Sequence, residues 1–358
     1  MLRFVVAALV SITVAACSNV GKLTYGTQEL RAEIHRRAPN LASKDIIVPF
    51  EIAPEYLAKL KRQISPYMGP SERAQALLKA MFDPGVFGLT YRETVTRTAN
   101  ETIETKGGNC LSLAAVFVGF ARALNLRAYF MDASSRVQET REDADMLILT
   151  GHITAVVETE RGRVAMDFGR RLSPFRIYRV MDDVEAIAHF YNNLGYELIS
   201  ASRGANVDIP WDKVAQKFKM AIMVKHDFAR AWNNLGVAKV RMGLDKEART
   251  AYETAASLDK QFSSPLVNLG ILLMKRNEPG EAMRVFQRVL KMDPDNPRIN
   301  LFFALALWDL KKCHQAKKAI KRVLELDPGM RRARELLKKQ CQNLGQKMEE
   351  KIPGTDLK

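Results

Sequence analysis

The stretch Ala231-Trp232-Asn233-Asn234-Leu235-Gly236 decides the fold of the C-terminal half, because its last two residues recur 34 positions later as Leu269-Gly270. Three further columns repeat with the same period: Ala248, Ala282 and Ala316; Tyr252, Phe286 and Ile320; and Asp259, Asp293 and Asp327. Self-similarity at a fixed period of this length is the signature of small structural units that stack side by side. The sequence therefore predicts a repeat array in this half of the chain.

The pattern resembles the tetratricopeptide repeat, and residues 231–236 match the opening of that repeat. The resemblance implies a pair of antiparallel helices per repeat and an array that binds a protein or a peptide. Small residues let the two helices approach closely, and the aromatic or aliphatic column fills the space between them. The pairs Asp293-Pro294 and Asp327-Pro328 are typical of places where one helix ends and the next begins.

An earlier, degenerate copy precedes these repeats. Asn193-Leu194-Gly195 echoes Asn234-Leu235-Gly236 at an offset of 41, and an insertion of seven residues near 200–207 accounts for the difference from 34. A polar, basic helix after the last repeat would cap the array, because stacked repeats need a polar outer face at their ends. The predicted boundaries are about four repeats over 186–328, a capping helix over 329–350 and a tail over 351–358.

The N-terminus has the features of a targeting signal. Residues 4–16 form a largely apolar run of thirteen, too short for a spanning helix of ~20 residues, and residues 1–16 are predicted to be a signal peptide. Val14-Ala15-Ala16-Cys17 resembles the lipobox of bacterial lipoproteins, which implies acylation of Cys17. Ser18 follows, and the resemblance then favours the periplasmic face of the outer membrane. The alternative is an ordinary signal peptide with a chance cysteine.

Between the signal and the repeats, residues 17–50 are expected to be a linker and lead-in, and residues 51–185 a separate domain. Lys106-Gly107-Gly108-Asn109-Cys110 precedes an apolar stretch that predicts a buried helix. Asn109 is a good N-cap, so Cys110 should lie on the first turn. The positive end of the helix dipole favours the thiolate there, and the thiolate is the nucleophilic form. The alternative is an inert core cysteine.

Two alternating segments follow, at 151–158 and 163–168, with a turn at 159–162. If Glu160 and Arg161 form a two-residue loop, Asp167 lies opposite Thr154. His152 lies on the same face as Thr154, so Asp167 becomes its diagonal neighbour. Strand parity thus predicts a histidine with a carboxylate beside it.

A cysteine at a helix start, followed by histidine and aspartate on adjacent strands, resembles the transglutaminase-like superfamily over roughly residues 85–170. The resemblance implies an α+β, papain-like domain with Cys110 as nucleophile, His152 as general acid/base and Asp167 as its orienting group. For the oxyanion, the backbone N–H of Cys110 is a natural donor and Tyr91 a further candidate.

The leading hypothesis is an envelope cysteine hydrolase, a peptidase or amidase. Two departures leave the substrate class open: Ile153-Thr154-Ala155 stands where many members carry a tryptophan, and Leu111 follows the cysteine. The alternatives are a non-catalytic adaptor and a cross-linking enzyme that transfers the acyl group to an amine. The sequence has no HExxH, no paired CxxC and no Gly-rich phosphate loop, so we expect neither a metal nor a cofactor.

Composition limits the other function classes. A mean hydropathy of −0.18 and 27% charged residues exclude a polytopic membrane protein. The net charge is +15, and residues 311–339 carry eleven Lys or Arg against three acidic residues. This region suits an anionic partner or membrane headgroups, and the alternative is an ordinary solvated helix surface. We do not expect nucleic acid, since aromatic residues are not interleaved with the basic ones.

Two of the four cysteines, Cys313 and Cys341, are available for a disulfide. Cys17 would carry lipid, and Cys110 would act as the nucleophile. The repeat register places Cys313 in the turn between the two helices of the last repeat and Cys341 near the far end of the capping helix. An oxidising compartment would let a disulfide between them persist. The alternative is a pair of unrelated cysteines.

Overall fold

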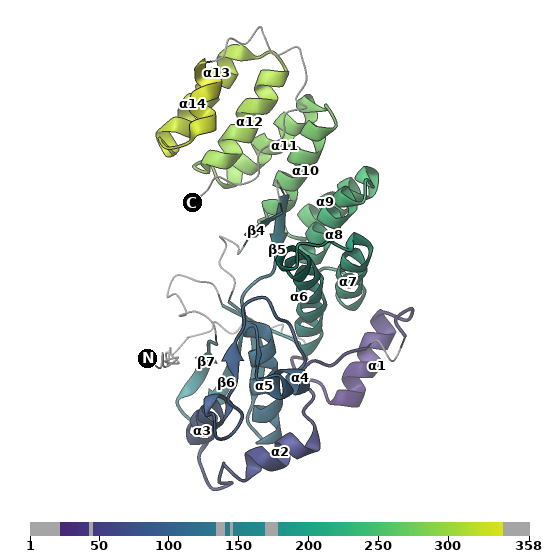
Figure 1. Ribbon diagram of the computed structural model, residues 1–358, viewed down its shortest axis with the longest axis vertical. Coiled ribbons are helices and arrows are strands. Elements are labelled where there is room, and N and C mark those ends of the chain that lie inside the picture. Colours follow the sequence, from purple (N-terminus) through teal and green to yellow (C-terminus); the bar gives the residue numbers. More distant parts are fainter. Residues whose placement is uncertain (1–21, 43–45, 134–139, 144–145, 169–177, 339–358) are drawn as a thin grey trace. The chain divides into compact units, whose positions relative to one another are not determined.

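The computed structural model describes residues 22–42, 46–133, 140–143, 146–168 and 178–338. The chain forms two compact units, which we describe separately (Figure 1). The first unit contains residues 1–139 and 150–226, and the second contains residues 140–149 and 227–358. Cys17 and Cys341 lie outside the described residues, as do the predicted signal peptide over 1–16 and the predicted tail over 351–358.

The first unit combines helices with a four-stranded antiparallel sheet of order β7-β6-β3-β8. A short parallel pair, β1 and β2, lies just before helix α5 in the chain. The strands are β1 (Thr90–Tyr91), β2 (Gly107–Gly108), β3 (Ala128–Asp132), β6 (Ile153–Thr159), β7 (Gly162–Met166) and β8 (Arg179–Met181). The helices are α1 (Thr27–Arg37), α2 (Pro54–Lys61), α3 (Pro70–Phe82), α4 (Ala99–Glu104), α5 (Cys110–Ala123), α6 (Asp183–Gly204) and α7 (Trp211–Val224).

Helix α5 is the core helix of this unit, and it packs against β3 and β6. Its side chains are apolar almost all round, so it is stable only where other elements cover it on every side. Phe117 and Phe120 are fully buried. Gly119 allows another segment to come close, because a Cβ there would lie 2.4 Å from the Phe50 carbonyl oxygen. The predicted lead-in contributes helix α1, whose Leu30 and Ile34 are buried.

The second unit is a row of helical hairpins that follow the predicted period. It also contains a two-stranded antiparallel hairpin of β4 and β5, which the sequence analysis left unassigned. Its elements are β4 (Thr140–Asp143), β5 (Met146–Leu149), α8 (Ala229–Arg241), α9 (Asp245–Leu258), α10 (Ser264–Lys275), α11 (Pro279–Met292), α12 (Pro297–Asp309), α13 (Cys313–Leu326) and α14 (Arg331–Lys338).

The first two hairpins of this unit are closed by a glycine on the first helix that lies against a ring on the second. A Cβ added at Gly236 would lie 2.5 Å from the ring of Tyr252, and one at Gly270 would lie 2.4 Å from the ring of Phe286. Both rings are fully buried. In the next pair the small residue is Ala304 and its counterpart is Ile320, and both belong to one core cluster. The period of 34 therefore reflects this helix contact.

The degenerate copy has the same contact but belongs to the first unit. A Cβ at Gly195 of α6 would lie 2.6 Å from the ring of Phe218 on α7. Helix α6 is also bound to the first unit, since Arg122 on α5 donates two hydrogen bonds of 2.8 and 2.9 Å to the buried carboxylate of Asp183. The backbone N–H of Thr96 donates to Glu197 at 2.8 Å. The boundary between compact units thus lies at 226/227, after the first helix pair, whereas the predicted array begins at 186.

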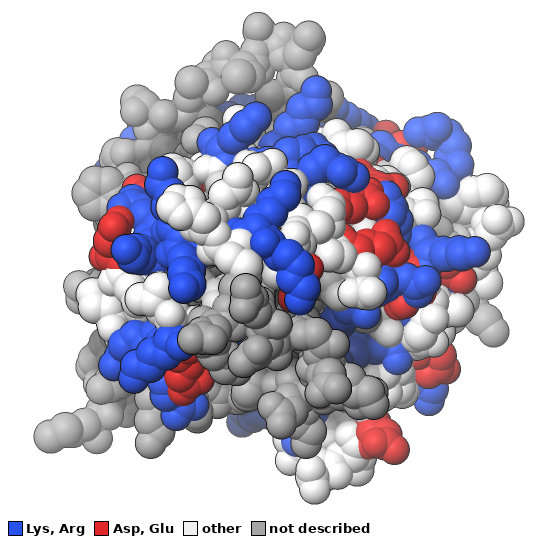
Figure 2. All heavy atoms as spheres, turned by 90° about the horizontal axis from the view of Figure 1, so that it is seen from above, with Lys and Arg blue, Asp and Glu red and all other residues white. Residues whose placement is uncertain are grey.

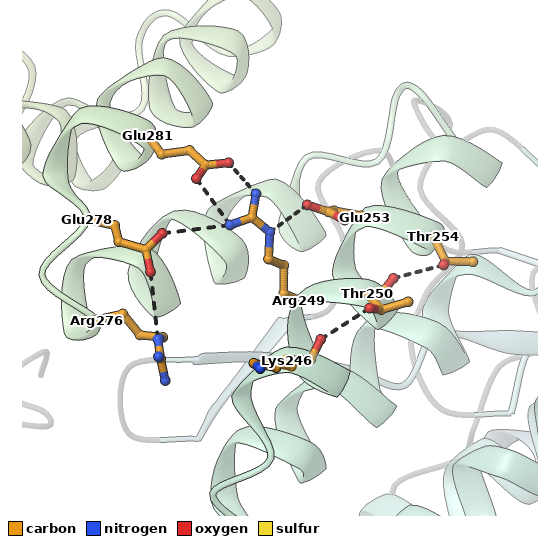
Figure 3. A network of polar contacts seen from close by, with 8 residues as sticks. All are labelled: Lys246, Arg249, Thr250, Glu253, Thr254, Arg276, Glu278 and Glu281. Atoms are coloured by element: carbon orange, nitrogen blue, oxygen red, sulfur yellow. Dashed lines mark hydrogen bonds and ion pairs between the residues drawn. The ribbon is translucent and has the colours of Figure 1, made fainter.

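Consecutive repeats are joined at the surface by an arginine with several carboxylates (Figure 3). Arg249 on α9 donates to Glu253 on the same helix at 2.9 Å and to Glu281 on α11 at 3.1 Å, and it lies 3.7 Å from Glu278. Because 38% of the Arg249 side chain is exposed, we expect this network to contribute no more than about 1 kcal/mol.

Two further observations concern the C-terminal region and membranes. Cys313 is the first residue of α13, directly after the turn of the last hairpin, and it is disulfide-bonded. The pairing with Cys341 stays a prediction, since that residue is outside the described part.

In the described residues, no helix has the length and the apolar character needed to cross a bilayer.

The glycine contact generates a stability prediction. We expect Gly270→Ala to lower the free energy of unfolding by about 1–3 kcal/mol, because the new methyl group would overlap the buried ring of Phe286. Gly280→Ala is the matched control in α11. Its Cβ would meet only Leu310 at 3.9 Å, so the change should leave the free energy of unfolding unchanged or raise it by up to about 1 kcal/mol, because alanine favours the helix over glycine. Urea unfolding followed by circular dichroism measures both, and equal stabilities of the two variants would contradict the packing argument.

Candidate functional site

Cys110 is the first residue of α5, and the residue before it caps the helix. The Asn109 side-chain oxygen accepts a hydrogen bond of 3.0 Å from the Ser112 backbone N–H. The Asn109 amide nitrogen donates to the Thr96 hydroxyl at 2.8 Å, which fixes the orientation of the cap. Cys110 is 7% exposed, and it is the free cysteine of the described residues. The thiol is therefore held at the positive end of a rigid, buried helix.

The two glycines before the cap leave room for neighbouring atoms. A Cβ at Gly107 would lie 2.7 Å from the Arg92 side chain and 2.9 Å from the Thr90 carbonyl oxygen. A Cβ at Gly108 would lie 2.5 Å from the Cβ of Ser112. The pairing of β1 with β2 therefore requires a glycine at 107, and the approach of Ser112 on α5 requires one at 108.

The histidine and the aspartate meet at the β6–β7 hairpin. Thr159 pairs with Gly162, so Glu160 and Arg161 form a two-residue loop, and Ala155 pairs with Met166. This register places Asp167 Oδ1 3.0 Å from His152 Nε2. Both side chains are buried, at 3% and 7% exposed. The expectation from strand parity agrees with the observed register.

Cys110 lies close enough to His152 to affect its protonation, so the structure brings the three residues together. Burial lowers the pKa of His152, but the hydrogen bonds to Asp167 and Cys110 and their negative charges outweigh it and raise the pKa to about 10. The imidazole is then protonated at neutral pH. A histidine next to a cysteine, with a carboxylate on its other side, is the arrangement of a nucleophile, a base and an orienting group.

Packing next to the aspartate holds this end of the hairpin in place. Phe168 follows Asp167, is 1% exposed, and has its ring centroid 5.9 Å from that of Phe117 on α5. Gly151 precedes His152 with φ of +75°, a left-handed backbone conformation that favours glycine. His152 is thus preceded by a glycine in a conformation that other residues rarely adopt, and Asp167 is followed by a buried aromatic ring.

Tyr91 lies on β1, opposite Gly108, and is 38% exposed. The other oxyanion candidate, the backbone N–H of Cys110, is among the first N–H groups of α5, which have no acceptor within the helix. The sequence analysis missed Thr96 and Ser112, which hold the cap: the Ser112 hydroxyl accepts from the Arg97 N–H at 2.8 Å. The cap asparagine was the available signal, because a buried asparagine needs partners for its amide.

The described residues contain no group of three or more His, Cys, Asp or Glu side chains that could hold a metal ion. A cavity of about 590 Å³ lies in the second unit among α9, α10 and α11. It is lined by residues of both charges, including Glu253, Lys260 and Arg288, and none of the three candidate residues lines it. The cavity therefore offers no argument about the chemistry of Cys110.

Comparison with known proteins identifies the repeats. Two family models described as tetratricopeptide repeat match residues 229–262 and 273–339. The second unit thus carries tetratricopeptide repeats, and protein or peptide partners are the class of ligand that it fits. No curated protein is significantly similar to the chain.

Several solved structures are similar to part of the chain. YrrB, a tetratricopeptide protein with an unusual peptide-binding site, is 22% identical, and the match covers 41% of this chain and 72% of YrrB with a TM-score of 0.35. MamA 41-end from Desulfovibrio magneticus RS-1 is 18% identical over 42% of this chain and 81% of its own, with a TM-score of 0.38.

The raised pKa of His152 gives a pH prediction. A histidine whose pKa is about 10 when folded and 6.5 when unfolded binds more protons in the folded state between these values. Its contribution to stability is complete below about pH 6.5 and is lost as the pH rises through 10. The difference in unfolding free energy between the wild type and His152→Gln should therefore shrink over this range. His35→Gln, at an exposed position, is the control, and a difference that stays constant from pH 6 to 10 would refute the prediction.

Proposed function

We propose that the chain is a lipid-anchored cysteine hydrolase of the bacterial envelope, a peptidase or amidase of transglutaminase-like type, whose repeats bind a protein or peptide. One observation carries the proposal: His152 Nε2 lies 3.0 Å from Asp167 Oδ1, and Cys110 at the start of α5 is near enough to raise the pKa of His152. A nucleophile, a base and an orienting group in contact are the arrangement that acyl transfer through a thioester requires.

In the proposed reaction the Cys110 thiolate attacks the carbonyl carbon of an amide. The His152 imidazolium gives its proton to the leaving nitrogen as the C–N bond breaks, and a thioester remains on the sulfur. The now neutral His152 then removes a proton from water, which attacks the thioester and releases a carboxylic acid and the thiolate. Asp167 keeps the imidazole oriented throughout, and the N–H of Cys110 would stabilise the oxyanion.

A non-catalytic adaptor is the second candidate, and the burial of the site favours it. Cys110 is 7% exposed and His152 is 2% exposed, so a substrate carbonyl must reach a nearly closed site. In that case the three residues would hold the fold together, and the repeats would supply the function. Amine transfer instead of hydrolysis is the third candidate, distinguished by incorporation of a labelled amine into protein.

Labelling by iodoacetamide tests the enzymatic proposal without a known substrate. We expect rapid alkylation at Cys110 in the wild type, since the neighbouring imidazolium favours the thiolate. His152→Ala should slow the alkylation by about tenfold or more, and Asp167→Asn should slow it less, because Asp167 orients the base without touching the thiol. Peptide mass spectrometry locates the label, and Cys110→Ala should carry none there.

The matched control is Thr94→Ala, outside the three-residue site. Circular dichroism must show that each variant retains the fold of the wild type. An alkylation rate at Cys110 that is the same in the wild type and in His152→Ala would exclude an activated thiol and leave the adaptor.

The proposed location rests on residues outside the described part. We expect Cys17→Ser to abolish acylation and to release the protein from membranes, because several acyl chains at ~0.8 kcal/mol per buried CH₂ provide the anchorage. Fractionation of cells with mass spectrometry of the mature N-terminus measures both effects. Wild-type protein that is unacylated and found in the cytoplasm would overturn the proposed location.

We also propose that the basic region 311–339 binds an anionic partner or membrane headgroups. Figure 2 shows Lys and Arg side chains spread over one face of the molecule, with Asp and Glu among them. On α13 the exposed basic residues support this idea, among them Lys317, Lys318 and Lys321. Arg322 instead pairs with Glu325 at 3.0 Å, as on an ordinary solvated helix.

A further inference from the structure

In the second unit, the β5 strand is bound by side chains of the repeats. One edge of β5 pairs with β4, and Leu147 lies opposite Glu142. The other edge faces two buried asparagines, Asn233 on α8 and Asn268 on α10, which we call the asparagine site. Figure 1 shows β5 next to these two helices, and the contacts agree.

The asparagine site recognises the backbone of one residue. Asn268 Oδ1 accepts from the Leu147 N–H at 2.9 Å, and Asn268 Nδ2 donates to the Leu147 carbonyl at 3.0 Å. Asn233 Nδ2 donates to the same carbonyl at 2.9 Å. A side-chain amide that both accepts from and donates to one residue replaces the peptide group of a neighbouring strand. The asparagine site therefore binds β5 through its backbone, as a neighbouring strand would.

The two asparagines are themselves oriented for this task. Asn268 Nδ2 also donates to Asn233 Oδ1 at 2.9 Å, and Asn233 Nδ2 donates to Asn234 Oδ1 at 3.1 Å. All three side chains are buried, so their amides have no access to bulk water when the site is filled. If β5 left, these groups would need another backbone in its place, because unpaired buried amides are costly.

The side chains on either side of Leu147 enter the repeat core. Met146 is fully buried and Ile148 is 1% exposed, whereas Leu147 is only half-buried. The Tyr252 hydroxyl lies 3.3 Å from the Met146 sulfur and donates to it. Tyr252 is the ring that closes the first hairpin of this unit. The site thus selects three consecutive residues: an apolar residue, then any residue that has a backbone N–H, then a second apolar residue.

The segment that fills the site comes from a part of the sequence that lies between two strands of the first unit. Residues 140–149 lie between β3 and β6 of the first unit in sequence, but they pack with the second unit. None of the three hydrogen bonds to Leu147 involves its side chain. Backbone recognition together with two apolar positions is how a peptide is bound, and it does not require that the peptide belong to the same chain.

We propose that the β4–β5 hairpin is an internal ligand of the asparagine site, and that an extended segment of a partner protein competes with it. The partner segment has apolar side chains at two positions that flank one residue, and that central residue is not proline. The hairpin is tethered, so its effective concentration is high, on the order of millimolar. It therefore keeps the site closed to weak or poorly matched segments.

A peptide-binding experiment with the full chain tests the competition. The probe is a fluorescein-labelled peptide with the sequence of residues 144–151, ADMLILTG, and the measurement is fluorescence anisotropy. In a variant with Met146→Ser and Ile148→Ser, which loosens the hairpin, we expect at least about tenfold tighter binding than in the wild type. Adding Asn268→Leu to that variant should remove the gain.

Two matched controls separate recognition from general loosening. Asn300 on α12 is a buried asparagine whose amide donates to the carbonyl oxygens of Pro294 and Asn296, so Asn300→Leu should leave the peptide affinity unchanged. A peptide with proline at the position of Leu147 should not bind, because it lacks the N–H. Equal affinity of the wild type and the loosened variant, or equal binding of the proline peptide, would overturn the proposal.

A measurement on the wild type covers the case in which the loosened variant does not fold. Hydrogen exchange of the full chain is recorded with and without a saturating amount of the unlabelled peptide. We expect faster exchange at residues 146–149 when the peptide is bound and no faster exchange in α9. Peptide binding that leaves the exchange of these residues unchanged would show that it binds elsewhere and would refute competition.

Discussion

The close approach of a glycine to an aromatic ring is the contact on which the helical half of the molecule depends. At Gly236 and Gly270 the second helix comes so near that no side chain fits between them. The ring on the second helix then fills the space that the missing side chain leaves, and dense packing results. A larger residue at either glycine would separate the helices. Since each hairpin packs on the next, the spacing of the whole row depends on these positions.

The same contact at Gly195 and Phe218 explains how the first unit ends. Helix α6 continues to Gly204, nine residues after Gly195, whereas α8 ends at Arg241, five residues after Gly236. Of the seven extra residues between glycine and ring, four therefore lengthen the helix and three lengthen the loop before α7. Arg122 binds Asp183 in the first turn of α6, and Gly195 in the middle of α6 packs against Phe218 of α7. One helix therefore serves both as a core element and as half of a repeat-like pair.

Features that depend on residues close together in the sequence could be predicted, and contacts between distant segments could not. The period of 34 and the parity of the β6–β7 hairpin are both local, and the repeats and the contact of His152 with Asp167 followed from them. The contact of His152 with Cys110 depends on how α5 packs against β6, and only the order of residues suggested it. The β4–β5 hairpin was missed, because its edge partners are asparagine side chains about 90 to 120 residues away.

The asparagine site and the candidate catalytic site are linked by the chain itself. Leu149 ends β5, and only Thr150 and Gly151 separate it from His152. β5 pairs with the backbone of β4 along one edge and with side-chain amides along the other, whereas β6 lies between two backbone partners in its sheet. The edge of β5 that faces the side-chain amides is the one that a competing peptide would replace. A release of β5 would consequently begin two residues from the base of the proposed reaction, without disturbing the pairing of β6.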